Sequence, residues 1–209
     1  MYTVLDFEFN QGFEFDTNPT AINPNCRFEI IQIGAVKVNE NFEIIDKFNI
    51  YIKPVIYKRL HPYVEKITGI KPEMLRNATN FTDAFNQFKK FIGDSKILCI
   101  WGSSDLRALY RNMNYYNLIE NSLILEYIDV QQLTTKYLKY SKGGTIGLKN
   151  AVNALGLNEE EDFHNALNDA IYTARVFAKI CDKQPTIKIF NSKHIPKPKP
   201  AKVKHKKNV

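Results

Sequence analysis

An apolar stretch near the start of the chain, Val4–Phe9, carries two acids, Asp6 and Glu8. Acidic and apolar residues alternate along it with a period of two, so a β-strand would send both carboxylates to one face and the large apolar side chains to the other. A strand this apolar is expected in the middle of a sheet, where two acids on one face are costly unless a cation pairs with them. A hard divalent cation, which prefers oxygen ligands, would be such a partner. The alternative is an edge strand whose acids simply face water.

The composition is typical of a soluble globular protein, since the 209 residues are 44% hydrophobic and 24% charged. Three cysteines, Cys26, Cys99 and Cys181, are scattered and form no C-x-x-C pair. This argues against a disulfide framework or a thiolate zinc site and fits a reducing setting. No secretory signal is recognised at the start, and no apolar run is long enough to span a membrane. These patterns predict a cytoplasmic protein without a membrane partner.

Positive charge is concentrated at the end of the chain. The net charge is +7, but residues 183–209 contain nine lysines and no acid, which leaves −2 for residues 1–182. A run rich in lysine and proline buries no apolar surface, so we expect a folded domain over 1–182 and a disordered tail over 183–209. The tail either contacts phosphates without sequence preference or only keeps the protein soluble.

Hydrophobic periodicity predicts a mixed sheet with helices packed on it. After the first strand, residues 10–27 form a long connection that would hang over the two acids. Further strands are expected at 28–38, 42–52, 96–101 and 123–130, the first two forming an antiparallel meander with Val4–Phe9. Helices are expected at 61–67, 72–76, 81–92, from Asp105 onward, at 131–140, 146–155 and 165–181.

Three more polar residues are candidates for the same site. Asp105 directly follows an apolar strand and opens a helix, so it is either a ligand or an acid favoured by the helix dipole. His164 and Asp169 are five residues apart, which on one continuous helix is about 140° around the axis. They converge only if His164 lies on a loop before a helix capped by Asn165. Taken singly, Asp169 is a first-turn acid and His164 a surface histidine.

Together, these residues resemble the DEDDh 3′–5′ exonucleases of the RNase H-like superfamily. The matching motifs are Asp6-Phe-Glu8, Asp105 and His164-x4-Asp169, in the family's order. Other stretches that resemble the family are 29–38, 67–70, 147–151 and 155–157. The resemblance covers roughly residues 1–180, and among relatives the chain looks most like the Eri1/KapD-type group.

This resemblance implies an α/β fold of the RNase H-like type, with a five-stranded mixed sheet flanked by helices. It implies that Asp6, Glu8, Asp105 and Asp169 hold two Mg²⁺ or Mn²⁺ ions, which activate a water and stabilise the leaving 3′ oxygen. Asp6 would bridge both ions, Glu8 and Asp169 would bind the ion on the nucleophile side, and Asp105 would act more loosely. His164 matches the general base, because imidazole accepts protons near neutral pH.

Two departures bear on the substrate. Asn10 stands where the family commonly has threonine, so contacts to the terminal nucleotide are expected to differ. Trp101-Gly-Ser-Ser, the sequence before Asp105, lacks the asparagine or aromatic residue often found directly before this aspartate in proofreading exonucleases, which favours an Eri1-like assignment over a proofreading one.

Other residues are candidates for binding the 3′ end. The segment Thr68, Gly69 and Ile70 matches one that borders the terminal base in relatives, or is simply a helix–loop junction that needs glycine. Aromatic side chains can stack on bases. The candidates are Phe9, Phe13 and Phe15, with a place in the core as the favoured alternative for Phe9.

The sequence therefore predicts a 3′–5′ exonuclease that releases nucleoside monophosphates from single-stranded RNA or DNA with a free 3′ end, RNA being favoured. A DNA proofreading-type exonuclease is the alternative within this class. A noncatalytic nucleic-acid-binding protein on the same fold, or an interaction module such as a homodimer, gains nothing from acids that would face phosphates.

Overall fold

The computed structural model describes residues 1–13, 22–95, 97–119, 124–140, 143–181 and 185–195. Within them, six strands form one mixed sheet in the order β3-β2-β1-β4-β5-β6. The strands are β1 (Tyr2–Gln11), β2 (Phe28–Val38), β3 (Ile44–Tyr51), β4 (Ile97–Ile100), β5 (Ile124–Asp129) and β6 (Lys188–Asn191). The first three form an antiparallel meander, β1, β4 and β5 run parallel, and β6 is antiparallel to β5. The acid-bearing strand β1 is thus interior to the sheet.

The sixth strand differs from the sequence prediction of five strands followed by a disordered tail from residue 183. Strand β6 and the 3₁₀ turn Ser192–His194 lie inside that tail. Phe190 is buried in the core, and Lys188 Nζ lies 2.6 Å from Gln132 Oε1 and 3.4 Å from Asp129 Oδ2. The lysines before the proline run therefore belong to a strand with an apolar anchor, and residues 196–209 of the expected tail lie outside the described residues.

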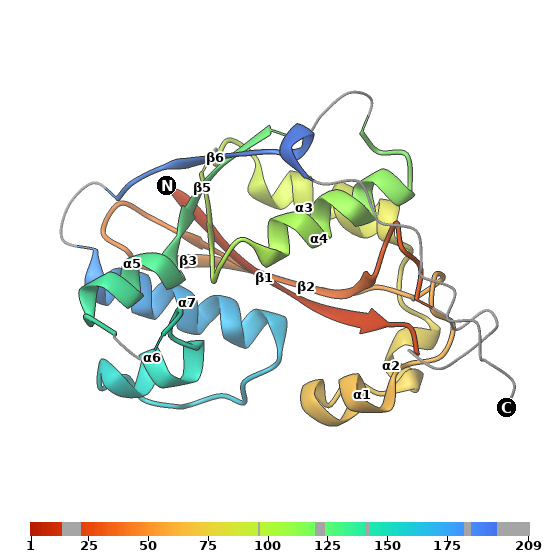
Figure 1. Cartoon of the computed structure of the whole chain (residues 1–209), viewed down its shortest axis with the longest axis horizontal. Coiled ribbons are helices and arrows are strands. Elements are labelled where there is room, and N and C mark those ends of the chain that lie inside the picture. The colour runs from red at the N-terminus through yellow and green to blue at the C-terminus, as the bar shows by residue number, and fades with distance from the viewer. Residues whose placement is uncertain (14–21, 96, 120–123, 141–142, 182–184, 196–209) are drawn as a thin grey trace, which may run out of the picture.

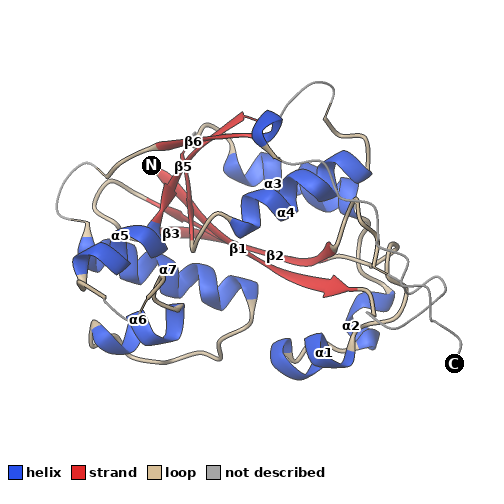
Figure 2. Ribbon diagram, viewed as in Figure 1, coloured by secondary structure: helices blue, strands red, loops and turns tan. Residues whose placement is uncertain are grey.

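Helices cover both faces of the sheet (Figures 1 and 2), as predicted. They are α1 (Pro62–Thr68), α2 (Pro72–Arg76), α3 (Phe81–Ile92), α4 (Ser104–Tyr115), α5 (Val130–Tyr137), α6 (Leu148–Ala154) and α7 (Ala166–Ile180). Helices α3 and α4 pack on one face and α5, α6 and α7 on the other, while α1 and α2 sit near the far ends of β1 and β2. Among the described helices, none has the length and apolar character needed to cross a membrane.

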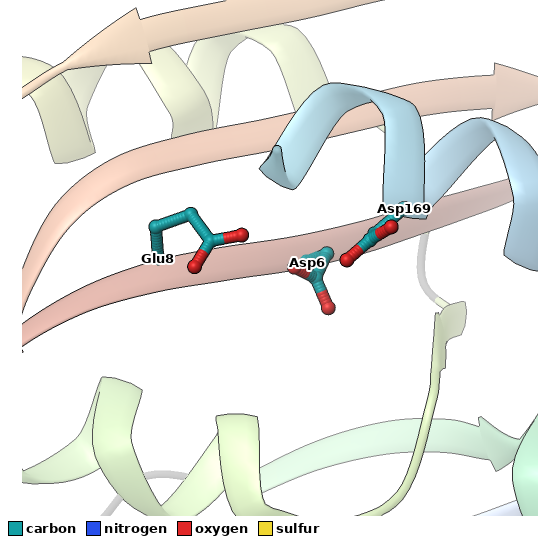
Figure 3. Close-up of side chains that lie close together, drawn as sticks. All are labelled: Asp6, Glu8 and Asp169. Atoms are coloured by element: carbon teal, nitrogen blue, oxygen red, sulfur yellow. The ribbon is translucent and has the colours of Figure 1, made fainter. Parts of the chain in front are cut away.

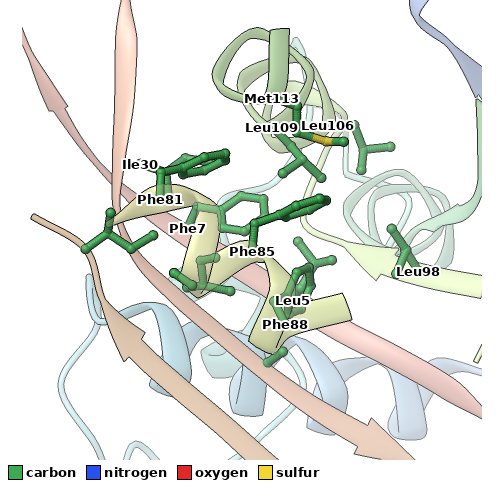
Figure 4. Packing of buried hydrophobic residues seen from close by; sticks show 14 of the residues in the cluster. Leu5, Phe7, Ile30, Phe81, Phe85, Phe88, Leu98, Leu106, Leu109 and Met113 are labelled. Atoms are coloured by element: carbon green, nitrogen blue, oxygen red, sulfur yellow. The ribbon is translucent and has the colours of Figure 1, made fainter. Parts of the chain in front are cut away.

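The main core consists of two clusters, one on each face of the sheet. Successive side chains of β1 contribute to one cluster and then to the other. Leu5 and Phe7 point toward α3 and α4, where they meet Phe88 and Leu109 (Figure 4). Val4, on the other face, packs in the cluster built around α7. Because each fully buried side chain of this size stabilises the fold by about 1.5–3 kcal/mol, both clusters hold β1 firmly between the helix layers.

The two edges of β1 are paired over different lengths. On one edge β2 pairs with it from Tyr2 to Gln11, whereas on the other β4 pairs only with Thr3 and Val4. The chain then leaves β4 after Ile100 and enters α4. On this second edge, the part of β1 that carries the two acids is beyond the pairing with β4, and Asp105 at the start of α4 is close enough to raise the pKa of both acids.

Candidate active site

Three carboxylates converge where β1 meets the start of α7. Asp6 and Glu8 project from the same face of β1, and Asp169 projects from the first turn of α7 toward them (Figure 3). One carboxylate oxygen from each residue lies within 4.8 Å of the others. Asp169 thus meets the two strand acids from the first turn of a late helix.

Helix α7 comes this close because β2 has a glycine at the crossing point. Gly34 pairs with Asp6 across the ladder, and a Cβ atom at this position would lie 2.1 Å from the carbonyl carbon of Ala166. The backbone of α7 therefore rests directly on β2. Asp169, within the first helical turn, is brought into reach of the acids on β1 by this contact.

A buried glutamine holds the start of α7 in place. Gln32, fully buried and opposite Glu8 in the ladder, accepts a hydrogen bond from Ala166 N at 3.2 Å. Its amide also donates to Asn165 Oδ1 at 3.4 Å. Asn165 Oδ1 in turn caps α7 by accepting from the backbone N–H groups of Leu167 and Asn168. Gln32 is thus a positioning residue for the site.

Sequence reasoning did not single out Gln32 or Gly34. Both lie in the stretch 29–38, which was noted only for its resemblance to the family. The available signal was a polar residue and a glycine inside an otherwise apolar buried strand, a pattern that indicates close approach of another backbone.

His164 lies on the loop before α7, as predicted. Its backbone has φ of 63°, in the left-handed region that residues other than glycine seldom adopt. In this conformation His164 N donates to Asp169 Oδ2 at 3.2 Å. The residue is exposed, so the imidazole is at the solvent-facing rim of the site while its main chain orients an acid within it.

Asp105 is set apart from the other three acids. It is 6% exposed in the first turn of α4 and does not belong to the group whose oxygens lie within 4.8 Å. Its charge nevertheless contributes to raising the pKa of both Asp6 and Glu8. That Asp105 acts more loosely than the other three acids stays a prediction.

All four acids are held in a setting that opposes ionisation. Desolvation by burial, followed by the charges of the neighbouring acids, raises the pKa of Asp6 well above its ordinary value and that of Glu8 to about 8. Burial and the charge of Asp169 raise the pKa of Asp105 to about 7. Burial raises the pKa of Asp169 to about 6, against the hydrogen bond from His164 N. Carboxylates crowded in this way repel one another unless a cation or protons neutralise them.

The donor set fits a hard divalent cation. All ligand atoms offered by Asp6, Glu8 and Asp169 are carboxylate oxygens, the type that Mg²⁺ and Mn²⁺ prefer. In addition, Asp169 Oδ1 is buried and has no hydrogen-bond partner among the described residues. A buried anionic oxygen without a donor is costly, and a cation would satisfy it.

Asn10 has a different role from the predicted contact with the terminal nucleotide. Its side chain is fully buried, and its Nδ2 donates to Tyr57 O at 2.9 Å and Arg59 O at 3.1 Å. Its Oδ1 accepts from His61 N at 3.0 Å. Because its donors and its acceptor are used within the fold, Asn10 fixes the segment before α1 instead of facing a ligand.

The segment Thr68, Gly69 and Ile70 is built as a helix–loop junction, the alternative named for it above. Gly69 ends α1 with φ of 68°, and Thr68 Oγ1 donates to Val64 O and accepts from Ile70 N. Ile70 is 1% exposed and packs in a satellite core cluster with Leu75. The side chain of Ile70 is therefore not available to a substrate in this arrangement.

The predicted stacking residues fall into three cases. Phe9 is half-buried, with its ring 6.0 Å from that of Phe28, and extends the core to the surface. Phe13 stacks on His61 at 4.6 Å and has Arg59 5.1 Å from its ring centroid. Phe15 lies outside the described residues.

Comparison with known proteins agrees with this geometry. A family model described as exonuclease matches residues 4–177. The chain belongs to the exonuclease family. Its fold is that of the RNase H-like superfamily, and similar solved structures include the nuclease domain of 3′hExo, a DEDDh family member, bound to rAMP. That structure is 21% identical, with a TM-score of 0.75, and the match covers 90% of this chain and 95% of that one. The match to cell-death related nuclease 4 has 20% identity and a TM-score of 0.72, covering 90% of this chain and 66% of the other.

The curated relatives of this exonuclease-family chain are much longer proteins. The chain is 31% identical over 188 residues to DNA polymerase III PolC-type of Thermotoga maritima, and 29% identical over 184 residues to that of Staphylococcus aureus. These matches cover 90% and 88% of this chain but 12% of each polymerase. The chain thus spans about an eighth of the length of these relatives.

Proposed function

We propose that this protein is a metal-dependent 3′–5′ exonuclease that removes nucleoside monophosphates from the 3′ end of single-stranded nucleic acid. The observation that carries the proposal is the convergence of Asp6, Glu8 and Asp169, whose oxygens lie within 4.8 Å on a buried strand and a helix start. None of the ion pairs among the described residues involves these three acids, and such a cluster has little use in a protein that only binds phosphates. Family membership supports the nuclease chemistry.

Each acid has a separate place in the proposed reaction. Two bound Mg²⁺ or Mn²⁺ ions would supply the charge that favours attack by water and departure of the 3′ oxygen. Asp6, between the other carboxylates in the cluster, would bind both, Glu8 and Asp169 would hold the nucleophile side, and Asp105 would complete the set from α4. His164, on its loop at the exposed rim, would take the proton from the attacking water.

Single-stranded RNA is the proposed preferred substrate, and single-stranded DNA is the second candidate. The residues before Asp105 favour RNA, because they lack the proofreading pattern. The similarity over most of this chain to DNA polymerase III PolC-type proteins favours DNA. The rate ratio between matched strands decides between them.

The test uses RNA and DNA oligomers of one sequence, each labelled at the 5′ end, with Mg²⁺, with Mn²⁺ or with EDTA. We expect a metal-dependent ladder in which labelled products shorten one nucleotide at a time from the 3′ end. The Asp169→Asn variant, purified in parallel, serves as the control for contaminating nucleases. Intact strands under every condition would exclude the proposed activity, and the binding experiment below would then decide whether the protein still binds nucleic acid.

A further inference from the structure

The outward face of α4 forms one wall of two neighbouring hollows. The larger, about 390 Å³, is lined by residues that include Arg27, Phe28, Ser104, Arg107 and Arg111. The smaller, about 250 Å³, is lined by residues that include Ser103, Arg107, Tyr127 and His194. Arg107 lines both, and none of the described residues that line either hollow is acidic. We call the larger hollow the α4 groove.

The α4 groove begins beside Asp105, the fourth acid of the candidate site. Ser104, one of its lining residues, immediately precedes Asp105. From there the groove follows α4 through Arg107 to Arg111. These two arginines are four residues apart and so lie on one side of the helix, with Cβ atoms about 5–6 Å from each other. A strand whose 3′ end is at the acids would therefore pass cations as it leaves.

Both arginines on α4 are available to a ligand. Arg107 is exposed and Arg111 is half-buried, and the ion pairs found among the described residues involve neither of them. A guanidinium group presents a planar fork of donors that matches two phosphate oxygens. The acids of the site attract cations, whereas the positive surface beside them attracts anions. That surface therefore suits a polyanion.

An aromatic ring lies in the groove beside the cations. Phe28, at the start of β2, is 41% exposed, and the guanidinium of Arg27 is 5.7 Å from its ring centroid. Its ring centroid is 6.0 Å from that of Phe9 on β1. Cations alternating with an exposed ring are the combination that binds single strands through phosphates and stacked bases.

The two walls of the groove are fixed to each other. Asn112 on α4 is fully buried; its Nδ2 donates to Phe28 O at 2.8 Å, and its Oδ1 accepts from Ile30 N at 3.0 Å. The start of β2 is thereby bonded to the helix that carries the arginines. A preformed surface of this kind loses less conformational entropy when a ligand binds.

We propose that the α4 groove binds the phosphodiester backbone of the substrate strand on the 5′ side of the nucleotide being removed. This inference rests on the proposed function, because it takes the carboxylate cluster as the place of the 3′ end. Arg107 and Arg111 contact successive phosphates, and Phe28 stacks on a base between them.

The experiment uses the full chain and the double variant Arg107→Gln/Arg111→Gln. Arg76→Gln is the matched control, since Arg76 is an exposed arginine in another basic hollow, beside Lys53 and Lys58. Binding of a fluorescent strand of about 20 nucleotides is measured in EDTA over a range of salt concentrations. In parallel, hydrolysis of this strand is compared with hydrolysis of the p-nitrophenyl ester of thymidine 5′-monophosphate, which has no upstream phosphates.

We expect the double variant to bind the strand about tenfold more weakly at moderate salt. The slope of log K against log salt should decrease in magnitude by about 0.7 for each arginine removed. In the double variant, the ratio of the rate of hydrolysis of the long strand to that of the ester should fall by about the same factor as the binding affinity. Arg76→Gln should match the wild type in both measurements. The single variant Arg107→Gln, at an exposed position, provides the same test if the double variant does not fold.

The failures of the groove and of the exonuclease are distinguishable. Suppose that the wild type cleaves both substrates while the double variant binds the long strand as tightly as the wild type. In that case the α4 groove does not bind the substrate strand, and the proposed exonuclease activity is unaffected. An equal loss in Arg76→Gln likewise overturns the groove. If the wild type cleaves neither substrate, the proposed function is wrong. The salt-dependent binding measurements then show by themselves whether the α4 groove binds a nucleic-acid strand.

Discussion

The two faces of β1 lie in different environments. On the face toward α3 and α4, Leu5 and Phe7 are almost completely buried in an apolar cluster. On the face toward α7, Val4 is equally buried, but Asp6 and Glu8 then project into a region with other acids. The apolar face thus stabilises the fold, whereas the repulsion between like charges on the acidic face destabilises it. The comparison predicts that substitutions on the two faces separate activity from stability.

The largest effect is expected from Asp169→Asn, which changes only the acidic face. Activity should fall by a factor on the order of 10²–10³, the size of the loss when one group that stabilises transition-state charge is removed. The amide is nearly isosteric and removes a repulsive charge, so the thermal unfolding midpoint in EDTA should stay equal or rise. Degradation rates and thermal melts measured on one preparation check both parts. Full activity in this variant would remove Asp169 from the site.

The apolar face should show the reverse pattern. Leu5→Ala leaves a cavity between β1, α3 and α4 and should lower the free energy of unfolding by about 2–5 kcal/mol. Activity per folded molecule at low temperature should change far less than in Asp169→Asn, since no carboxylate is removed. Denaturant unfolding and single-turnover rates are the measurements. A loss of activity as large as that of Asp169→Asn, in fully folded protein, would break the distinction between the faces.

The contact between α7 and β2 should affect both stability and activity. In Gly34→Ala the new Cβ meets the backbone of Ala166 at 2.1 Å, so α7 has to move away from the sheet. Overpacking of this kind costs about 1–3 kcal/mol, and a shift of about 1 Å in Asp169 should lower the rate about 10²-fold.

Gly147→Ala is the matched control for this substitution. A Cβ at Gly147 meets nothing within 4 Å, and its φ of −75° suits any residue. Stability and activity of the control should equal those of the wild type. Equal behaviour of Gly34→Ala and Gly147→Ala would show that the close approach of α7 does not position Asp169.

The acidic face should also give the folded protein a pH-dependent stability. The folded-state pKa values of Glu8 (about 8), Asp105 (about 7) and Asp169 (about 6) lie above the ordinary carboxyl values of 4.5 and 3.8. The folded metal-free protein therefore binds more protons than the unfolded chain, and its stability should fall as the pH rises from about 4 to about 8. Each proton involved changes the free energy of unfolding by about 1.4 kcal/mol per pH unit within its range.

Thermal unfolding in EDTA at several pH values measures this decline. Added Mn²⁺ should restore stability most strongly at the alkaline end, because the ion requires ionised carboxylates. A Glu8→Gln variant should show a shallower decline. A midpoint that rises with pH in EDTA would contradict the assigned direction of these pKa values.

Local sequence patterns predicted most elements, and the resemblance to the DEDDh exonucleases indicated the candidate site acids. Alternation along β1, the apolar face of α3 and the cap of α7 by Asn165 each depend on residues close together in the chain, and the structure has them as expected. His164 lies on the loop before α7, which is the position that its convergence with Asp169 requires. The substrate contacts were less successful, because Asn10 and Ile70 are buried by partners that no local pattern identifies.

The sequence by itself determined that two acids would share one face of an apolar strand and that a third would open a late helix. Side-chain periodicity fixes the first, and capping preferences fix the second. Only the tertiary structure decided that these acids meet, through the bond from Ala166 to Gln32, 134 residues apart, and through the space left by Gly34. It also decided that Lys188–Asn191 would complete the sheet and that Arg107 and Arg111 would face an open groove. Such contacts join residues far apart in the chain, so they depend on how the layers pack rather than on any neighbouring residue.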